Sequence, residues 1–338
     1  MITILQFIGG FVLLLFGAEY LVRGAVSLAR RLNVSPMIIG MTIVAYGTTA
    51  PELVVSLQAA IDGLPGIAVG NVVGSNIANI LLILGVSSVI FPIVVNPKAL
   101  YRDAAVMGGS ALLFTALALS GRIERWQGIL MVAVLIGYSV YAFWSERKRG
   151  KANDPGDMAE ELADEFKDPP QATWLSILSV LGGVAAVVTG AKLLVTAAVF
   201  TARSLGVGEE IIGLTIVAVG TSLPELATAT VAALKKHSEV AVGNIMGAGI
   251  YNLLAIMGLV SAVSPVDVPR QILAFDLWFM LAVTGALMFF LMVRKGLARP
   301  VGAAFLALFV AYTVLQYYGV ERVFGPVKQA AAGIGLSG

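Results

Sequence analysis

Residues 38–53 read IIGMTIVAYGTTAPEL and residues 211–226 read IIGLTIVAVGTSLPEL, each within a long apolar run. The match continues without a gap to residues 85 and 258 at a constant offset of 173, and 24 of 48 positions are identical. In this register Glu52 corresponds to Glu225 and Pro51 to Pro224. A carboxylate at the centre of a bilayer costs about 2.5–3.5 kcal/mol. Two such groups at matching positions predict a polar site inside the membrane, and we expect it to bind cations.

The composition is that of an integral membrane protein, because 58% of the residues are hydrophobic and only 12% are charged. Ten apolar runs are long enough to span a bilayer, and the first is interpreted as a span and not as a cleaved signal peptide. The runs fall near residues 2–29, 36–60, 66–92, 101–120, 126–145, 173–202, 210–234, 239–263, 272–293 and 301–319.

The repeat extends upstream, where residues 16–34 match residues 189–207 at the same offset. Each copy therefore holds five spans, and an odd number means that the second copy enters the membrane from the opposite side. The fold expected is an all-α membrane protein of ten transmembrane helices, arranged as two inverted five-helix repeats with broken helices at the midplane. Inverted repeats with interrupted spans are typical of secondary transporters. Good packing of a duplicated helix pair would explain the repeated glycines but not the two glutamates.

The domain organisation follows from the same repeat. Its parts are a first repeat at 1–145, an acidic cytoplasmic linker at 146–172, a second repeat at 173–319 and a tail at 320–338. The linker is interpreted as a hinge, with a short surface helix through Met158, Leu162 and Phe166 as the alternative.

The distribution of positive charge predicts orientation. If the amino terminus lies outside the cytoplasm, fourteen lysines and arginines fall in cytoplasmic loops and six on the other side. Because cytoplasmic loops carry the excess of positive charge, we expect both termini outside the cytoplasm.

The repeated motif places several kinds of oxygen together. Proline lacks an N–H group and clashes with the carbonyl four residues back, so Pro51 and Pro224 each free a backbone carbonyl in mid-span. Thr48 and Glu52 are four residues apart and share a helix face, as do their counterparts Thr221 and Glu225. Carboxylate, hydroxyl and carbonyl oxygens are the ligands of hard cations, and calcium takes about 6–8 of them.

The neighbouring segments add amides and a hydroxyl. Ser75 and Asn79 are spaced i,i+4 and could present oxygens on one face, with Asn252 in the second copy. Asn76 and Asn244 fit ion ligation and hydrogen bonding between helices equally well. The other polar residues singled out are assigned structural or solvated roles. These are a Glu19–Arg23 pair one helical turn apart, Lys192, which replaces Glu19 in the copy, and the lone His237 in a loop.

The segments GTTAPE with GSNIAN and GTSLPE with GAGIYN resemble the alpha repeats of the cation/calcium antiporter superfamily. This superfamily includes the sodium/calcium exchangers, and the chain most resembles its bacterial inner-membrane members, over essentially its whole length. The resemblance implies cation exchange by alternating access around four clustered sites, one for calcium and the rest for sodium. The calcium ligands that it implies are Thr48, Glu52, Thr221 and Glu225. The sodium sites would add Thr49, Ser75, Ser222 and the carbonyls of Ala45 and Ala218, and Asn79 and Asn252 would line the central site.

The chain departs from the family pattern at four positions. Ala248 stands where many members have a serine matching Ser75, which removes a hydroxyl from one sodium site. Asn252 stands where exchangers often have aspartate, which removes a negative charge. Gly249 and Ala50 replace the usual asparagine and leucine. The calcium ligands are intact, so fewer than three sodium ions per calcium, or protons as the counter-ion, are both open.

The leading hypothesis is a secondary antiporter that moves calcium out in exchange for sodium, with inorganic cations and the lipid bilayer as partners. Proton-coupled exchange, in which Glu52 and Glu225 carry protons, is the alternative within transport. An intramembrane hydrolase using both carboxylates and a cation channel are disfavoured, since the glutamates sit among cation-ligand residues in a duplicated site. No enzyme activity, cofactor or nucleic-acid partner is expected.

Overall fold

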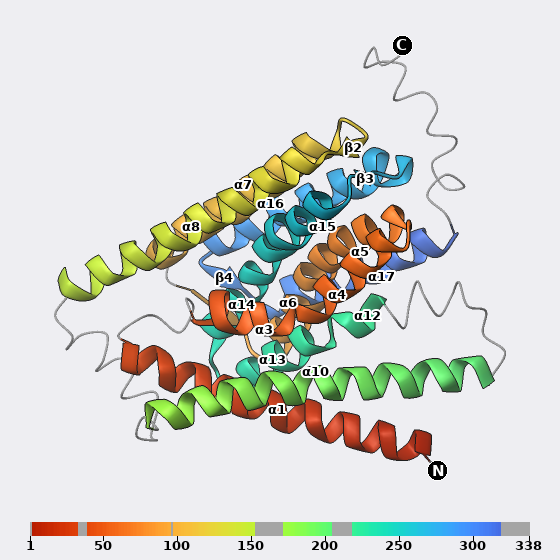
Figure 1. The fold of residues 1–338 in the computed structure, drawn as a ribbon. Coiled ribbons are helices and arrows are strands. Elements are labelled where there is room, and N and C mark those ends of the chain that lie inside the picture. The colour runs from red at the N-terminus through yellow and green to blue at the C-terminus, as the bar shows by residue number, and fades with distance from the viewer. Residues whose placement is uncertain (1, 33–38, 96, 153–171, 205–217, 319–338) are drawn as a thin grey trace.

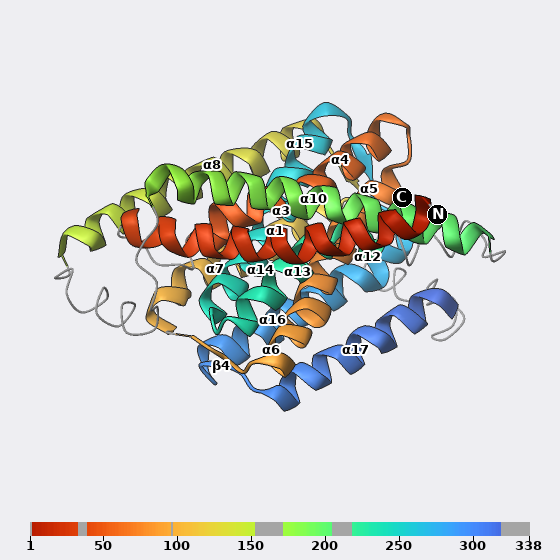
Figure 2. The ribbon, with the colours of Figure 1, turned by 90° about the horizontal axis from the view of Figure 1, so that it is seen from below.

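The computed structural model describes residues 2–32, 39–95, 97–152, 172–204 and 218–318. Apart from four two-residue strands, all regular structure in these residues is helical (Figures 1 and 2). Seven of the described helices are long and apolar enough to cross a membrane. They are Ile2–Ala29, Pro65–Ile90, Arg125–Ala142, Thr173–Thr201, Ser238–Val263, Ile272–Met292 and Arg299–Gln316.

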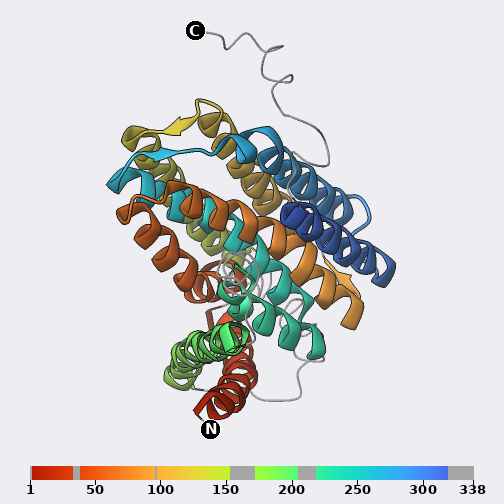
Figure 3. The same ribbon diagram turned by 90° about the vertical axis from the view of Figure 1, so that its right-hand side faces the viewer.

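Two long helices, α1 (Ile2–Leu32) and α10 (Thr173–Ser204), lie side by side along one face of the molecule (Figure 3). They run antiparallel, because Gly10 abuts Gly190 while Gly17 abuts Gly183 and Ala186. A Cβ at Gly10 would lie 2.8 Å from the Gly190 carbonyl oxygen, and one at Gly183 would lie 2.7 Å from the Leu21 nitrogen. Small residues therefore let the two backbones approach closely, as is common in membranes.

The centre of the fold consists of two long, interrupted helices. One comprises α5 (Pro65–Ala78), η2 (Asn79–Ile83) and α6 (Leu84–Ile90), and the other α14 (Ser238–Ile250), η4 (Tyr251–Ile256) and α15 (Met257–Val263). Both carry a π-helical segment, which widens the helix locally and is frequent at functional sites. Asn79 is the first residue of η2 and Asn252 the second of η4.

Two expected spans, 36–60 and 210–234, are broken helices. In the first, η1 (Gly40–Val44) and α3 (Ala45–Thr48) are followed by α4 (Ala50–Ile61). In the second, α12 (Ala218–Thr221) is followed by α13 (Leu223–Leu234). The breaks fall at Thr49 and Ser222, two residues before Pro51 and Pro224, as the proline argument predicts. Residues 36–38 and 210–217 lie outside the described residues.

The remaining helices pack around this centre as α7 (Pro97–Ala118), α8 (Arg125–Ala152), α16 (Leu277–Met292) with η5 (Ile272–Asp276), and α17 (Arg299–Tyr318). The expected span at 101–120 is α7, which is not among the seven described helices that are long and apolar enough to cross a membrane. The count of ten spans therefore stays a prediction. Helix α8 continues to Ala152, into the expected linker. The rest of that linker, including Met158, Leu162 and Phe166, and the tail from 320 lie outside the described residues.

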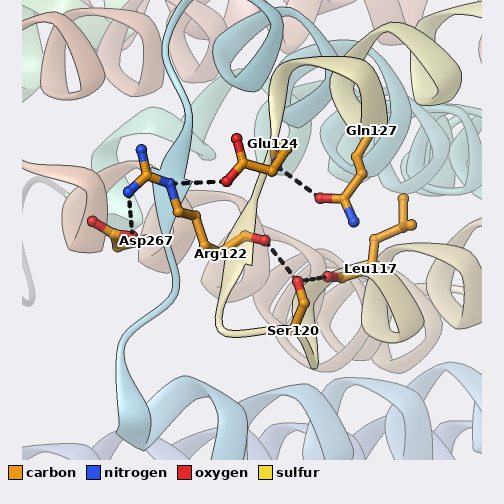
Figure 4. Close-up of polar contacts among 6 residues, drawn as sticks. All are labelled: Leu117, Ser120, Arg122, Glu124, Gln127 and Asp267. Atoms are coloured by element: carbon orange, nitrogen blue, oxygen red, sulfur yellow. Dashed lines mark hydrogen bonds and ion pairs between the residues drawn. The ribbon is translucent and has the colours of Figure 1, made fainter.

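Two small antiparallel ribbons join segments far apart in the chain. β1 (Ile93–Val94) pairs with β4 (Gly296–Leu297), and β2 (Arg122–Ile123) pairs with β3 (Val266–Asp267). At the second ribbon the Arg122 guanidinium lies 3.2 Å from Glu124 and 3.7 Å from Asp267 (Figure 4). Each ribbon links one strand from the first 145 residues to one from the second copy, so the two halves are tied together at two places.

Candidate cation site

The two glutamates occupy equivalent places at helix starts. Glu52 lies in the first turn of α4 and Glu225 in the first turn of α13. The amino-terminal end of a helix carries partial positive charge, so it stabilises a nearby carboxylate. Thr49 and Ser222, the residues at the breaks, have backbone angles near φ −83°, ψ 3° and φ −89°, ψ 5°. The local structure is therefore the same in both copies, and it turns each acidic side chain into the protein interior.

Both carboxyl groups are withdrawn from the surface, with 1% of Glu52 and none of Glu225 exposed. The other predicted ligands that act through side chains are also buried. They are Thr48, Thr49, Ser75, Asn79, Thr221, Ser222 and Asn252. Of the two predicted carbonyl ligands, Ala45 is buried in α3 and Ala218 begins α12.

The two halves meet at these side chains. The Ser222 hydroxyl donates a hydrogen bond of 3.4 Å to Glu52 Oε1, and Thr221 also interacts with Glu52. In the reciprocal direction, Glu225 interacts with Thr48 and with the Glu52 charge. Each glutamate is thus approached by hydroxyl groups from the opposite copy, and the two repeated motifs form one site.

Several buried oxygens of this cluster have no hydrogen-bond partner among the described residues. They are Glu52 Oε2, both carboxylate oxygens of Glu225, Asn79 Oδ1 and Asn252 Oδ1. A buried polar atom without a partner is costly, and a buried charge is more so. Five such oxygens, three of them from two carboxyl groups, are of the kind that bind hard cations, and calcium takes about 6–8 oxygens. No group of three or more acidic, histidine or cysteine side chains occurs among the described residues, so further ligands would be neutral.

The Ala45 carbonyl, which the resemblance implies as a sodium ligand, already accepts hydrogen bonds within the protein. It accepts hydrogen bonds from the Thr49 nitrogen at 3.0 Å and the Thr49 hydroxyl at 2.7 Å, and the Thr48 hydroxyl lies 3.4 Å away. A sodium ion at this carbonyl would have to share it with, or displace, the Thr49 hydroxyl. Because that hydroxyl is itself a predicted sodium ligand, rotation of one side chain would release both oxygens.

The two copies of the repeat carry different residues at one position near the site. Ser75 is 4% exposed on α5, and its counterpart Ala248 is fully buried on α14. The next residue, Gly249, lies close to Asn76, because an added Cβ would be 3.1 Å from Asn76 Oδ1. The Asn76 amide donates to the Val72 carbonyl of its own helix at 2.8 Å. The two halves therefore offer different oxygens on the α5 and α14 sides.

Two asparagines form hydrogen bonds to the segments that carry the predicted ligands, and only one of them was considered from the sequence. The Asn244 Oδ1 atom accepts a 3.3 Å hydrogen bond from the Thr48 hydroxyl, which joins α14 to α3. Its counterpart Asn71 donates to the Ser56 hydroxyl at 2.9 Å and to the Glu52 carbonyl at 3.3 Å. The signal for Asn71 was its identity with Asn244 at the offset of 173.

A second pair of buried acids was missed altogether. Asp103 is fully buried on α7, where it accepts from the Tyr138 hydroxyl at 2.8 Å and pairs with Arg102 at 2.6 Å. Asp276, at the same offset of 173, accepts from the Tyr312 hydroxyl at 3.0 Å. Both aspartates are hydrogen-bonded to the adjacent outer helix, and this contact explains their burial. The predicted Glu19–Arg23 pair is confirmed, with a separation of 2.7 Å.

Membrane-length helices around a buried, doubly acidic cluster of oxygens define a membrane transport protein for cations. The family model described as "Sodium/calcium exchanger protein" matches residues 2–144 and 175–318. The chain belongs to the sodium/calcium exchanger family of cation antiporters.

Individual relatives agree over nearly full length. The chain is 37% identical to "Putative antiporter CaxA" of Alkalimonas amylolytica, covering 91% of this chain and 96% of that protein. It is 33% identical to "Sodium/calcium exchanger MaX1" of Methanosarcina acetivorans, covering 91% and 97%. A solved structure of the sodium-calcium exchanger NCX_Mj superposes with a TM-score of 0.80 at 28% identity, covering 93% of this chain and 98% of that one. The expected class of membrane antiporter is confirmed, and these relatives are transporters and not enzymes.

Proposed function

We propose that this protein exchanges calcium for sodium across the membrane by alternating access to the site formed by Glu52 and Glu225. The observation that carries the proposal is the cluster of buried oxygens without hydrogen-bond partners, contributed by both copies of the motif. Two carboxylates balance one calcium ion, or two monovalent ions in its place. The relatives named as sodium/calcium exchangers support the same pair of ions.

The calcium ligands in this proposal are Thr48, Glu52, Thr221 and Glu225, all of which the structure buries together. Sodium would use Thr49, Ser75, Ser222 and the carbonyls of Ala45 and Ala218, with Asn79 and Asn252 lining the centre. The halves would be inverted and the spans ten in number. The antiparallel packing of α1 on α10, which are equivalent at the offset of 173, supports an inversion. The chain would lie in a bacterial inner membrane, with both termini outside the cytoplasm.

Proton-coupled exchange is the second candidate, because both oxygens of Glu225 are buried without partners beside Glu52. Close carboxylates of this kind can share or exchange protons. Flux measurements, and not the geometry of the site, therefore decide whether sodium or protons are the counter-ion.

Calcium flux into vesicles containing the purified protein separates these functions. We expect an imposed sodium gradient to drive calcium uptake against its own gradient, because both ions compete for the same two charges. A pH gradient of equal size, imposed without sodium, should have little effect. Uptake driven by the pH gradient alone would replace sodium by protons, and uptake only down the calcium gradient would indicate a channel.

A further inference from the structure

An ion pair connects α1 to the helix that carries Glu225. Glu19 Oε1 on α1 lies 2.6 Å from Lys235 Nζ, in addition to its 2.7 Å contact with Arg23. Lys235 is the residue that caps the carboxyl-terminal end of α13. A cation is favourable at this end of a helix, and here it also holds a carboxylate of α1. The pair thus fixes one position of α1 relative to the site helix.

The repeat contains a counterpart of this pair with its charges exchanged. At the offset of 173, Glu19 corresponds to Lys192 on α10, and Lys235 corresponds to Asp62 at the end of α4. The two charges are again opposite, so the second pair is as complementary as the first. Opposite charges at both pairs of matching positions point to the same contact in each copy, and a structural role for Lys192 alone does not explain Asp62.

In the described residues the counterpart pair, Lys192 and Asp62, does not form an ion pair. Asp62 Oδ1 instead accepts a 2.8 Å hydrogen bond from the Gln58 side chain. Helix packing differs between the two copies in the same way: α1 packs along α13, whereas α10 makes no extensive contact with α4. Asp62 also lies at the carboxyl-terminal end of α4, where a negative charge is unfavourable. It would gain from a cation brought up to it by α10.

We infer that Glu19–Lys235 and Lys192–Asp62 are two alternative latches, each closed when the other is open. The first holds the paired helices α1 and α10 in the position seen here, against α13. The second closes when the pair slides toward α4, and it holds the state that opens to the other side. The inference rests on the proposed alternating access and adds the residues that set the balance between its two states.

Cysteine probes measure that balance, since the chain contains no cysteine of its own. Ser56→Cys and Ala229→Cys are matched positions, both buried one turn beyond Glu52 and Glu225. The ratio of their labelling rates with a membrane-impermeant thiol reagent reports which side of the site is open. Glu19→Gln and Lys192→Gln should shift this ratio in opposite directions, each by up to about fivefold, the contribution of a partly exposed ion pair.

Matched variants separate the latch from a general effect of charge. Glu124→Gln removes a charge that pairs with Arg122 at the β2–β3 ribbon and contacts neither latch, so it should leave the ratio unchanged. Exchanging the charges, as Glu19→Lys with Lys235→Glu, should move the ratio back toward the wild-type value from that of the single variant, and so should Lys192→Asp with Asp62→Lys. Shifts of the two single variants in the same direction, or no shift in either, would overturn the inference.

Cross-linking tests the open pair directly. The double variants Glu19→Cys with Lys235→Cys and Lys192→Cys with Asp62→Cys should each be joined by a short bis-methanethiosulfonate reagent, which forms one mixed disulfide with each thiol and releases sulfinate. A spanning reagent is used because the contact is made by the ends of long side chains, and a direct disulfide needs closer backbones. The two cross-links should be favoured under opposite ionic conditions, and each should block transport until reduced. Failure of the second pair to cross-link under any sodium or calcium concentration would contradict the latch. If the two probes in the otherwise unmodified chain never respond to ions, alternating access itself fails. If the two probes respond to ions but Glu19→Gln and Lys192→Gln do not shift their labelling ratio, only the latch is rejected.

Discussion

Glu52→Gln and Glu225→Gln should each abolish calcium transport while the protein still folds in the membrane. Glutamine keeps the shape of the side chain but removes one of only two negative charges in a fully buried site. Removing one partner of a buried charge interaction costs about 2–5 kcal/mol. We therefore expect the apparent calcium affinity to fall by at least about 30-fold, which corresponds to the lower end of this range, about 2 kcal/mol.

Uptake of radioactive calcium by vesicles with a sodium gradient measures this loss, and size-exclusion chromatography of the purified variant shows whether it is folded. Glu124→Gln is the control, because Glu124 lies outside the site and pairs with Arg122 at the β2–β3 ribbon (Figure 4). It should transport at the wild-type rate. Near-normal calcium transport by either site variant would remove that carboxylate from the ion site.

Ala248→Ser should increase the dependence of transport on sodium. Ala248 is buried at the place where its counterpart Ser75 offers a hydroxyl, and a methyl group cannot replace an oxygen ligand. The site beside Ala248 should therefore hold sodium poorly, with fewer than three sodium ions moved per calcium. The added hydroxyl should raise the apparent sodium affinity or the Hill slope and leave calcium affinity nearly unchanged.

Sodium-dependent calcium efflux, measured over a range of sodium concentrations, gives both quantities. Ser75→Ala is the matched variant and should act in the opposite direction, lowering the sodium affinity. A wild-type Hill slope already near three that Ala248→Ser leaves unaltered would show that other oxygens complete the sodium shell.

Local sequence chemistry was sufficient to predict the helix breaks at the candidate site. The offset of 173 paired Glu52 with Glu225, and the missing N–H of Pro51 and Pro224 located the breaks at Thr49 and Ser222. Spacing of four residues predicted the contact between Glu19 and Arg23. All of these follow from residues close together in the chain, where helix geometry fixes the distances.

Features that depend on contacts between distant segments could not be predicted in this way. The hydrogen bond from Ser222 to Glu52 and the pairing of β1 with β4 require the packed fold. The π-helical segment that begins at Asn79 was not predicted either, because its other residues are apolar and do not distinguish it from an ordinary α-helical turn. The burial of Asp103 depends on its hydrogen bond from Tyr138, 35 residues away in the chain, and it was not considered from the sequence.

The central claim is that one site, shared by the two glutamates, opens to one side of the membrane at a time. Labelling of Ser56→Cys and Ala229→Cys, each as the single cysteine of the chain, tests it most directly. Replacing saturating sodium by calcium should raise the labelling rate of one position and lower that of the other. Rates that rise and fall together, or that do not respond to either ion, would contradict alternating access and indicate a continuous pore or a closed structural site.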